Sequence, residues 1–185
     1  MHWIDPDHLP ITRGKIARLL LNHHGHLDGV LLKDGTEVHI PPHLSGKLLP
    51  RMKIGDSIVV RGVRVRGKPL IVAVVVEPAH GAAVVDNGPQ AEKTVERHTP
   101  TKAERWGYSG VIEYLVHGPK GDVHGVILDD GVHLRFPPHA AKRFANVLKV
   151  GREIEVEGTW HESPHGVVIH ADHLARAGRP LEAVE

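Results

Sequence analysis

A short run of the chain concentrates positive charge. Four cationic side chains fall within eight residues: Arg61, Arg64, Arg66 and Lys68. A planar guanidinium matches two phosphate oxygens at once, and a hairpin tip can project it without burying charge. The run therefore predicts contact with the backbone of a nucleic acid. The alternative is a solvated hairpin whose charges serve solubility, because a basic run is a weak signal by itself.

Histidine is the second residue type that stands out, with 17 copies in 185 residues. Imidazole is a ligand for zinc, copper and nickel, which suggests a metal- or pH-responsive module. The sequence has no cysteine, however, and the histidine spacing lacks the regularity of known zinc motifs. Adventitious binding of metal by loops is the alternative. The candidate ligands are His117, His124, His161 and His165.

Residue patterns that carry catalysis are missing from the sequence. It contains no Gly-x-Ser-x-Gly, no phosphate-binding loop, no cysteine nucleophile and no His-Glu-x-x-His. Asp129 and Asp130 form a carboxylate pair, but Gly131 follows them, so a tight turn is the better interpretation. We therefore expect a binding protein that is not an enzyme and needs no cofactor.

An internal repeat fixes the elements that must position these residues. Residues 14–73 align with residues 110–169 without a gap, at a constant offset of 96 positions. A repeat of this length is a small domain and not a solenoid unit. The matched positions include Gly14 with Gly110, Asp34-Gly35 with Asp130-Gly131, Pro41-Pro42-His43 with Pro137-Pro138-His139, and Gly62 with Gly158.

Each copy is predicted to contain three strands, a short helix and two further strands. The Asp-Gly pairs predict tight hairpin turns, and the Pro-Pro pairs end the sheet because proline donates no ladder hydrogen bond. His43 and His139 are expected to cap the helix or to contact a turn there. The expected strands are 15–21, 30–32, 37–40, 56–62 and 69–77, then 110–117, 125–129, 132–136, 152–160 and 166–173, with helices near 43–52 and 140–148.

Alternation along 37–40 places Val38 and Ile40 inward and Glu37 and His39 outward. The expected domains are residues 10–78, with a net charge of +6, and residues 107–174, with a net charge of −3. Residues 79–106 are predicted to be a linker, and the tail from Ala175 is predicted to fray.

The order of elements resembles the oligonucleotide/oligosaccharide-binding (OB) barrel family. The chain also resembles small bacterial proteins with two barrel repeats and the pattern Gly-x-Val/Ile, Asp-Gly-x-x-Val/Leu and Gly-x-x-Ile-x-Val-x-Gly, present here twice. The fold implied is all-β, with two tandem five-stranded OB-like barrels and a short helix between strands 3 and 4 of each. A small SH3-like barrel is the competing interpretation, and the helix argues against it.

The resemblance implies a ligand face on strands 2 and 3, flanked by the loops between strands 1 and 2 and between strands 4 and 5. The basic run lies in the second of these loops. No Phe, Tyr or Trp lies between Trp3 and Trp106, so the first copy is expected to bind through backbone charge. In the second copy, Tyr114 and Trp160 are either stacking surfaces for bases or edge packing against the linker or the other domain, and that copy is expected to be an interaction or dimerisation module. The further candidates for nucleic-acid contact are Arg18, His39, Tyr114 and Trp160.

The expected function is binding of single-stranded nucleic acid by the first barrel, with low sequence specificity and a steep dependence on salt. The alternative is a protein–protein adaptor or dimerisation module, including a homo-oligomer. The first residues lack the pattern of a signal peptide and no apolar run would span a bilayer, so a cytoplasmic protein without a membrane partner is expected.

Overall fold

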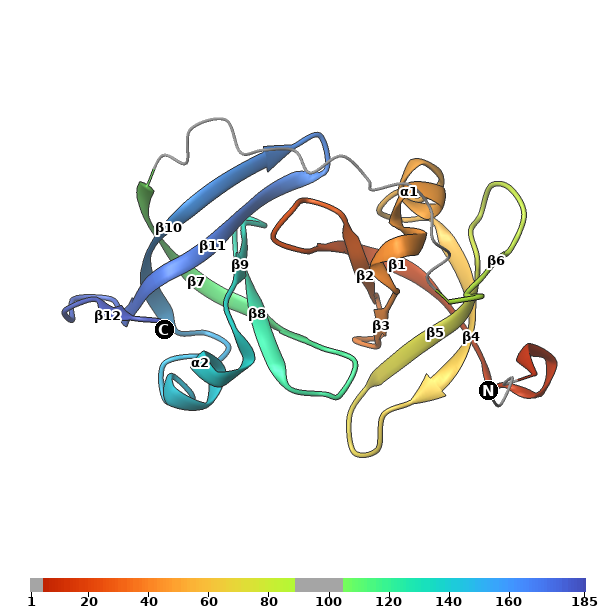
Figure 1. Cartoon of the computed structure of the whole chain (residues 1–185), viewed down its shortest axis with the longest axis horizontal. Coiled ribbons are helices and arrows are strands. Elements are labelled where there is room, and N and C mark those ends of the chain that lie inside the picture. Colours follow the sequence, from red (N-terminus) through yellow and green to blue (C-terminus); the bar gives the residue numbers. More distant parts are fainter. Residues whose placement is uncertain (1–4, 89–104) are drawn as a thin grey trace. The chain divides into compact units, whose positions relative to one another are not determined.

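The computed structural model describes residues 5–88 and 105–185, which divide into two compact units (Figure 1). Each unit contains a closed five-stranded barrel with one added short strand. The all-β class and the two barrels predicted from the sequence are confirmed.

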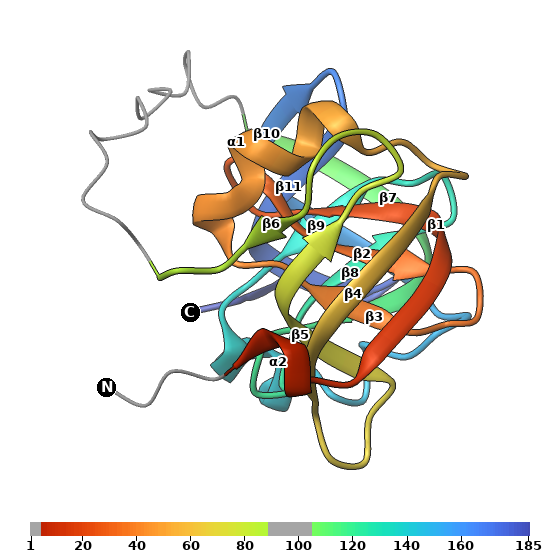
Figure 2. The same cartoon turned by 90° about the vertical axis from the view of Figure 1, so that its right-hand side faces the viewer.

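The first barrel closes in the order β3-β2-β1-β4-β5, with a parallel pairing of β3 and β5 that completes the ring. Figure 2 shows β4 running between β1 and β5, the two strands with which it pairs. Its strands are β1 (Ile11–Leu21), β2 (Leu27–Leu32), β3 (Glu37–His39), β4 (Ser57–Arg64), β5 (Leu70–Glu77) and the added β6 (Val84–Val85).

The second barrel repeats this arrangement. Strands β10, β7, β8, β9 and β11 follow one another, β9 and β11 are parallel, and β10 pairs with β11 to close the ring. Its strands are β7 (Arg105–His117), β8 (Val123–Leu128), β9 (His133–Arg135), β10 (Glu153–Ser163), β11 (Gly166–Arg176) and the added β12 (Glu182–Ala183).

Both predicted Asp-Gly turns are present. Gly35 has a φ of 85° and Gly131 a φ of 88°, a left-handed conformation that glycine adopts without strain. In each turn the aspartate side chain accepts a hydrogen bond from the amide two residues later, Asp34 from Thr36 and Asp130 from Val132. The turns fix the register of β2 with β3 and of β8 with β9, which sets which side chains enter each core.

The predicted alternation along β3 is confirmed, with Val38 and Ile40 facing the core. The residues on the opposite face are, however, mostly shielded from solvent. Val38 and Ile40 are fully buried in the core of the first barrel. Glu37 lies on the opposite face but is also buried, with 6% of its surface exposed. Because β3 is paired on both sides, Glu37 lies between Leu31 of β2 and Leu70 of β5, which are themselves buried.

Short helices follow the Pro-Pro pairs, as the sequence predicts. In the first barrel a 3-10 turn (Pro42–Leu44), α1 (Ser45–Leu48) and a second 3-10 turn (Leu49–Arg51) cover one end of the core. In the second barrel the helix predicted near 140–148 is α2 (Pro138–Arg143). It begins at the second proline of the pair and ends five residues earlier than predicted. Neither helix has a side-chain cap, so the capping role predicted for His43 and His139 is wrong. His43 instead contacts Asp86, with 2.8 Å between Nε2 and Oδ1.

A β-bulge in each barrel explains the added strands β6 and β12. The register between β4 and β5 shifts at Arg61/Gly62, which leaves Val74 of β5 without a partner on β4. The register between β10 and β11 shifts at Glu157/Gly158, which leaves Asp172 of β11 without a partner on β10. The Asp86 amide donates to the Val74 carbonyl (2.7 Å), and the Val184 amide donates to the Asp172 carbonyl (2.8 Å). The extra carbonyl at each bulge is therefore satisfied by the segment that carries β6 or β12.

These added strands lie where the sequence analysis expected a linker and a frayed tail. Val84 of β6 is buried in the first core, although it falls within the predicted linker 79–106. Residues 89–104 of that linker lie outside the described residues. The prediction of a frayed tail is wrong, because β12 pairs with β11 and Val184 is 1% exposed.

No helix in the described part of the chain is long and apolar enough to span a membrane.

Candidate nucleic-acid interface

The basic run forms the hairpin between β4 and β5. The Val65 amide donates to the Leu70 carbonyl (2.9 Å), and the Lys68 amide donates to the Val65 carbonyl (3.3 Å). Gly67 has a φ of 75°, which lets the chain reverse direction between the two strands. The hairpin is therefore a defined turn that presents its side chains from a paired strand end.

Three of the four predicted cations are exposed on this hairpin. Arg64, at the end of β4, lies 3.4 Å from the Thr12 hydroxyl through Nη2, and Arg66 and Lys68 lie on the turn. Arg66 and Lys68 form no ion pair with a described residue, so their charges are not neutralised there. We refer to Arg64, Arg66 and Lys68 as the basic hairpin. Three exposed cations this close together create a local positive potential that attracts anions.

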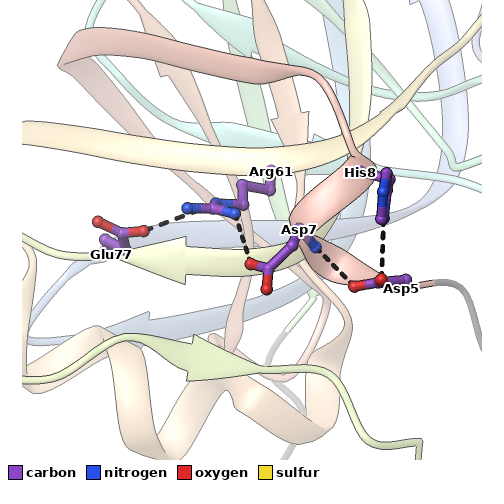
Figure 3. A network of polar contacts seen from close by, with 5 residues as sticks. All are labelled: Asp5, Asp7, His8, Arg61 and Glu77. Carbon is purple, nitrogen blue, oxygen red and sulfur yellow. Dashed lines mark hydrogen bonds and ion pairs between the residues drawn. The ribbon is translucent and has the colours of Figure 1, made fainter.

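Arg61 differs from these three residues because carboxylates already hold it (Figure 3). Its Nη1 donates to Asp7 Oδ1 (2.8 Å), and its Nε lies 3.9 Å from Glu77 Oε1. The side chain is 26% exposed, and it joins the segment before β1 to strands β4 and β5. The bulge at Gly62 separates Arg61 from the basic hairpin, so the structure gives Arg61 a bracing role.

The segment that pairs with Arg61 is itself ordered by aspartates. Asp5 caps the 3-10 turn Pro6–His8 by accepting from the Asp7 amide (3.0 Å), and it also contacts His8 (2.8 Å), as Figure 3 shows. The Asp7 amide, and then His8, hold the pKa of Asp5 below its ordinary value. This capped turn places the Asp7 carboxylate beside Arg61.

The other two candidates in the first barrel are less exposed than the basic hairpin. Arg18 is half-buried on β1. The His39 side chain is 11% exposed, and its Nδ1 lies 4.0 Å from Asp28 Oδ1. Asp28 and Glu37, on the same two strands, are buried. The structure therefore does not bring His39 together with the basic hairpin as one cationic surface.

In the second barrel, Trp160 belongs to an aromatic group that the sequence analysis did not assemble. Its ring centroid lies 5.8 Å from that of Tyr108 and 6.5 Å from that of Trp106. We call these three residues the aromatic cluster. Trp160 and Tyr108 are half-buried against the core, whereas Trp106 is 53% exposed. Tyr114, the other predicted stacking residue, is half-buried further along β7.

A carboxylate touches the aromatic cluster. The Tyr108 hydroxyl donates a hydrogen bond to Asp130 in the turn between β8 and β9. This hydrogen bond to Asp130, with a smaller contribution from burial, raises the pKa of Tyr108 to about 12. Asp129 accepts from the Val111 amide (3.1 Å), which agrees with the turn role predicted for both aspartates.

The four histidines proposed as metal ligands lie on different parts of the second barrel. His117 ends β7, His124 is on β8, His161 is on β10 and His165 is in the turn after β10. Within residues 5–88 and 105–185, no group of three or more histidine, aspartate or glutamate side chains is arranged so that it could hold a metal ion. The geometry therefore gives the metal hypothesis no support in this region.

Comparison with known proteins yields structural likenesses of low score. No family model and no curated protein matches the chain. One similar solved chain is the OBody AM1L10 bound to hen egg-white lysozyme, with 23% identity over 42% of this chain and 82% of that chain, and a TM-score of 0.31. Another is the single-stranded DNA binding protein from Thermus aquaticus, with 16% identity over 94% of each chain and a TM-score of 0.28. A deletion mutant of that protein matches at 15% identity over 93% of each chain, with a TM-score of 0.27. Scores this low carry no argument, so the description of the chain as two all-β barrels rests on the strand pairings.

Proposed function

We propose that this protein is a non-enzymatic binding protein whose first barrel contacts the phosphate backbone of single-stranded nucleic acid. The observation that carries the proposal is the basic hairpin, where Arg64, Arg66 and Lys68 are exposed while the neighbouring Arg61 is held by carboxylates. The hairpin between strands 4 and 5 is also a ligand-binding loop of OB barrels in general.

Binding of this kind depends on charge and not on base identity. No Phe, Tyr or Trp lies between Trp3 and Trp106, so the described part of the first barrel offers only histidine rings for base stacking. Three phosphate contacts on a single strand give a log–log salt slope of about −2. We therefore expect weak sequence preference and an affinity that falls steeply as salt increases.

The test is fluorescence anisotropy of a labelled, mixed-sequence single-stranded oligonucleotide titrated with metal-free protein across a salt series. Reversing two charges with Arg64→Glu and Arg66→Glu should weaken binding at least about 100-fold at low salt. Lys149→Glu changes the same charge at an exposed site of the second barrel, so it serves as the control and should have little effect. Unchanged affinity in the double variant would overturn the proposal.

The protein–protein alternative makes a different prediction for the same assay. An adaptor that uses the hairpin to meet an acidic protein surface should show no salt-sensitive binding to mixed-sequence oligonucleotides. That result would favour an acidic protein surface, and not nucleic acid, as the ligand of the basic hairpin.

A further inference from the structure

The aromatic cluster presents an exposed indole next to acidic groups. Trp106 is 53% exposed and packs on Trp160, which also contacts Tyr108. Tyr108 in turn holds Asp130, and Asp129 next to it is exposed. Trp160 and Tyr108 are half-buried, but Trp106 leaves about half of its surface in solvent. A residue that only packed against the core would be more buried than this.

The surroundings of the cluster select the charge of its ligand. The face of an indole is electron-rich and attracts a cation. The carboxylates of Asp129 and Asp130, which act on Tyr108 of the same cluster, add negative charge on this side of the barrel. The same carboxylates repel phosphate, which argues against a nucleic-acid strand at this place. A planar guanidinium fits best, because it stacks on an aromatic ring and also hydrogen-bonds to a carboxylate.

The chain carries such a ligand on its own first barrel. The basic hairpin projects Arg64 and Arg66, and the adjacent Val63 is 46% exposed and supplies apolar surface for contact with an indole. The two surfaces are complementary in charge, in keeping with the net charges of +6 for residues 10–78 and −3 for residues 107–174.

We propose that the basic hairpin of one molecule docks on the aromatic cluster of a second copy, with an arginine stacked on Trp106. Donor and acceptor are different surfaces of the same chain, so the contact is head-to-tail and can propagate into rings or open chains. This self-association does not require the proposed function. It uses the same hairpin, however, so an oligonucleotide that binds there displaces the second copy.

Sedimentation velocity over a protein concentration series at low salt tests this proposal. Arg64→Glu with Arg66→Glu removes the donor, and Trp106→Ala with Asp129→Lys removes the acceptor. Lys33 occupies the position of Asp129 in the first copy, so the same kind of turn accommodates lysine. Each double variant alone should stay monomeric, with self-association weakened at least about tenfold.

A mixture of the two double variants gives the sharpest result. One variant retains the acceptor and the other retains the donor, so the mixture should form a 1:1 dimer and nothing larger. Trp106→Phe keeps an aromatic ring and should retain most of the association, which separates stacking from a general loss of structure. Self-association of either double variant at the wild-type level would overturn the proposal, as would a mixture that stays monomeric.

An oligonucleotide titration separates this inference from the proposed function. The acceptor variant should bind oligonucleotide like the wild type, because its basic hairpin is intact. If Trp106→Ala instead weakens oligonucleotide binding and leaves self-association unchanged, the cluster is a base-stacking surface and the docking proposal fails.

Discussion

The hairpin between β4 and β5 and the hairpin between β10 and β11 occupy the same place in their barrels but carry different chemistry. At the offset of 96, Arg61 corresponds to Glu157, Arg64 to Trp160, and Arg66 to Glu162. The backbone device is shared, since both strands bulge at the equivalent glycines, Gly62 and Gly158. The comparison shows that the two barrels share the backbone of the bulged hairpin, and that the side chains on it determine which ligand each hairpin can bind.

The contact at the base of each hairpin repeats this contrast. In the first barrel Arg64 approaches the Thr12 hydroxyl. At the equivalent positions of the second barrel, Trp160 packs on the ring of Tyr108. In the first barrel this pair of positions makes a polar contact, and the Arg64 side chain stays exposed. In the second barrel the equivalent pair makes an aromatic contact, on which the exposed Trp106 packs.

Substituting the bulge glycines tests whether the two barrels depend equally on the bulge. It is expected to have the largest effect on the free energy of unfolding. A Cβ added at Gly62 would lie 2.3 Å from the Val72 carbonyl oxygen, and at Gly158 it would lie 2.0 Å from the His170 carbonyl oxygen. Gly62→Ala and Gly158→Ala should each lower the free energy of unfolding by about 3 kcal/mol or more. Chemical denaturation measures this loss.

The control for these variants is Gly46→Ala. A Cβ at Gly46 meets no atom within 4 Å, and alanine favours a helix, so stability should stay level or rise slightly. A large loss at one bulge glycine and none at the other would show that the two barrels do not depend equally on the bulge.

Trp160→Arg places the residue of the first barrel into the second. It removes the indole that contacts Trp106 and Tyr108, so the free energy of unfolding should fall by about 1–2 kcal/mol. Oligonucleotide affinity, measured by anisotropy, should change less than twofold, because Glu157 and Glu162 keep this hairpin acidic. A clear gain in affinity would mean that a single cation, and not the group of three, is sufficient. Trp160→Phe is the matched control for stability.

Arg61→Gln separates the bracing arginine from the exposed ones. Loss of the ion pairs with Asp7 and Glu77 should cost about 0.5–1 kcal/mol, because Asp7 is 85% exposed and the pairs are screened. Oligonucleotide affinity should fall less than threefold, whereas Arg64→Gln should weaken it more. Equal losses of affinity in the two variants would place Arg61 in the interface.

The titration of Tyr108 is the smallest expected effect. Its hydrogen bond to Asp130 raises the pKa to about 12 from an ordinary value near 10. The stabilisation is therefore fully present below about pH 10 and is lost as pH rises toward 12. Ultraviolet difference absorbance on a Tyr114→Phe background isolates Tyr108. Ionisation near pH 10 would show that the hydroxyl does not donate to Asp130 in solution.

The repeat made much of this fold predictable. Once two copies were aligned, weak signals in one copy supported those in the other, and the Asp-Gly turns fixed the hairpins and hence the inward residues. Strands β6 and β12 were missed because a two-residue strand has no periodicity. Their cause is the bulge, which creates an unpaired carbonyl that no local pattern reveals.

The candidate site was less predictable, because its composition depends on contacts between distant residues. The run of cations pointed to the hairpin, but nothing in its spacing showed that Arg61 pairs with Asp7, which is 54 positions away. The aromatic cluster did leave a signal that could have been used. Trp106 and Tyr108 are two residues apart, so they share one face of a strand. The prediction of a linker up to residue 106 hid that alternation.

The capture of the bulge carbonyls by the Asp86 and Val184 amides also bears on aggregation. Strand β3 pairs with β5 only along Leu70–Val72, so the later part of β5 would offer a free edge to a strand from another chain. β6 pairs with that stretch at Val75 and Val76 and closes it off. β12 does the same for His173 and Leu174 of β11. Each added strand thus protects an edge of its own barrel from the strand addition that leads to fibrils, a role distinct from ligand binding.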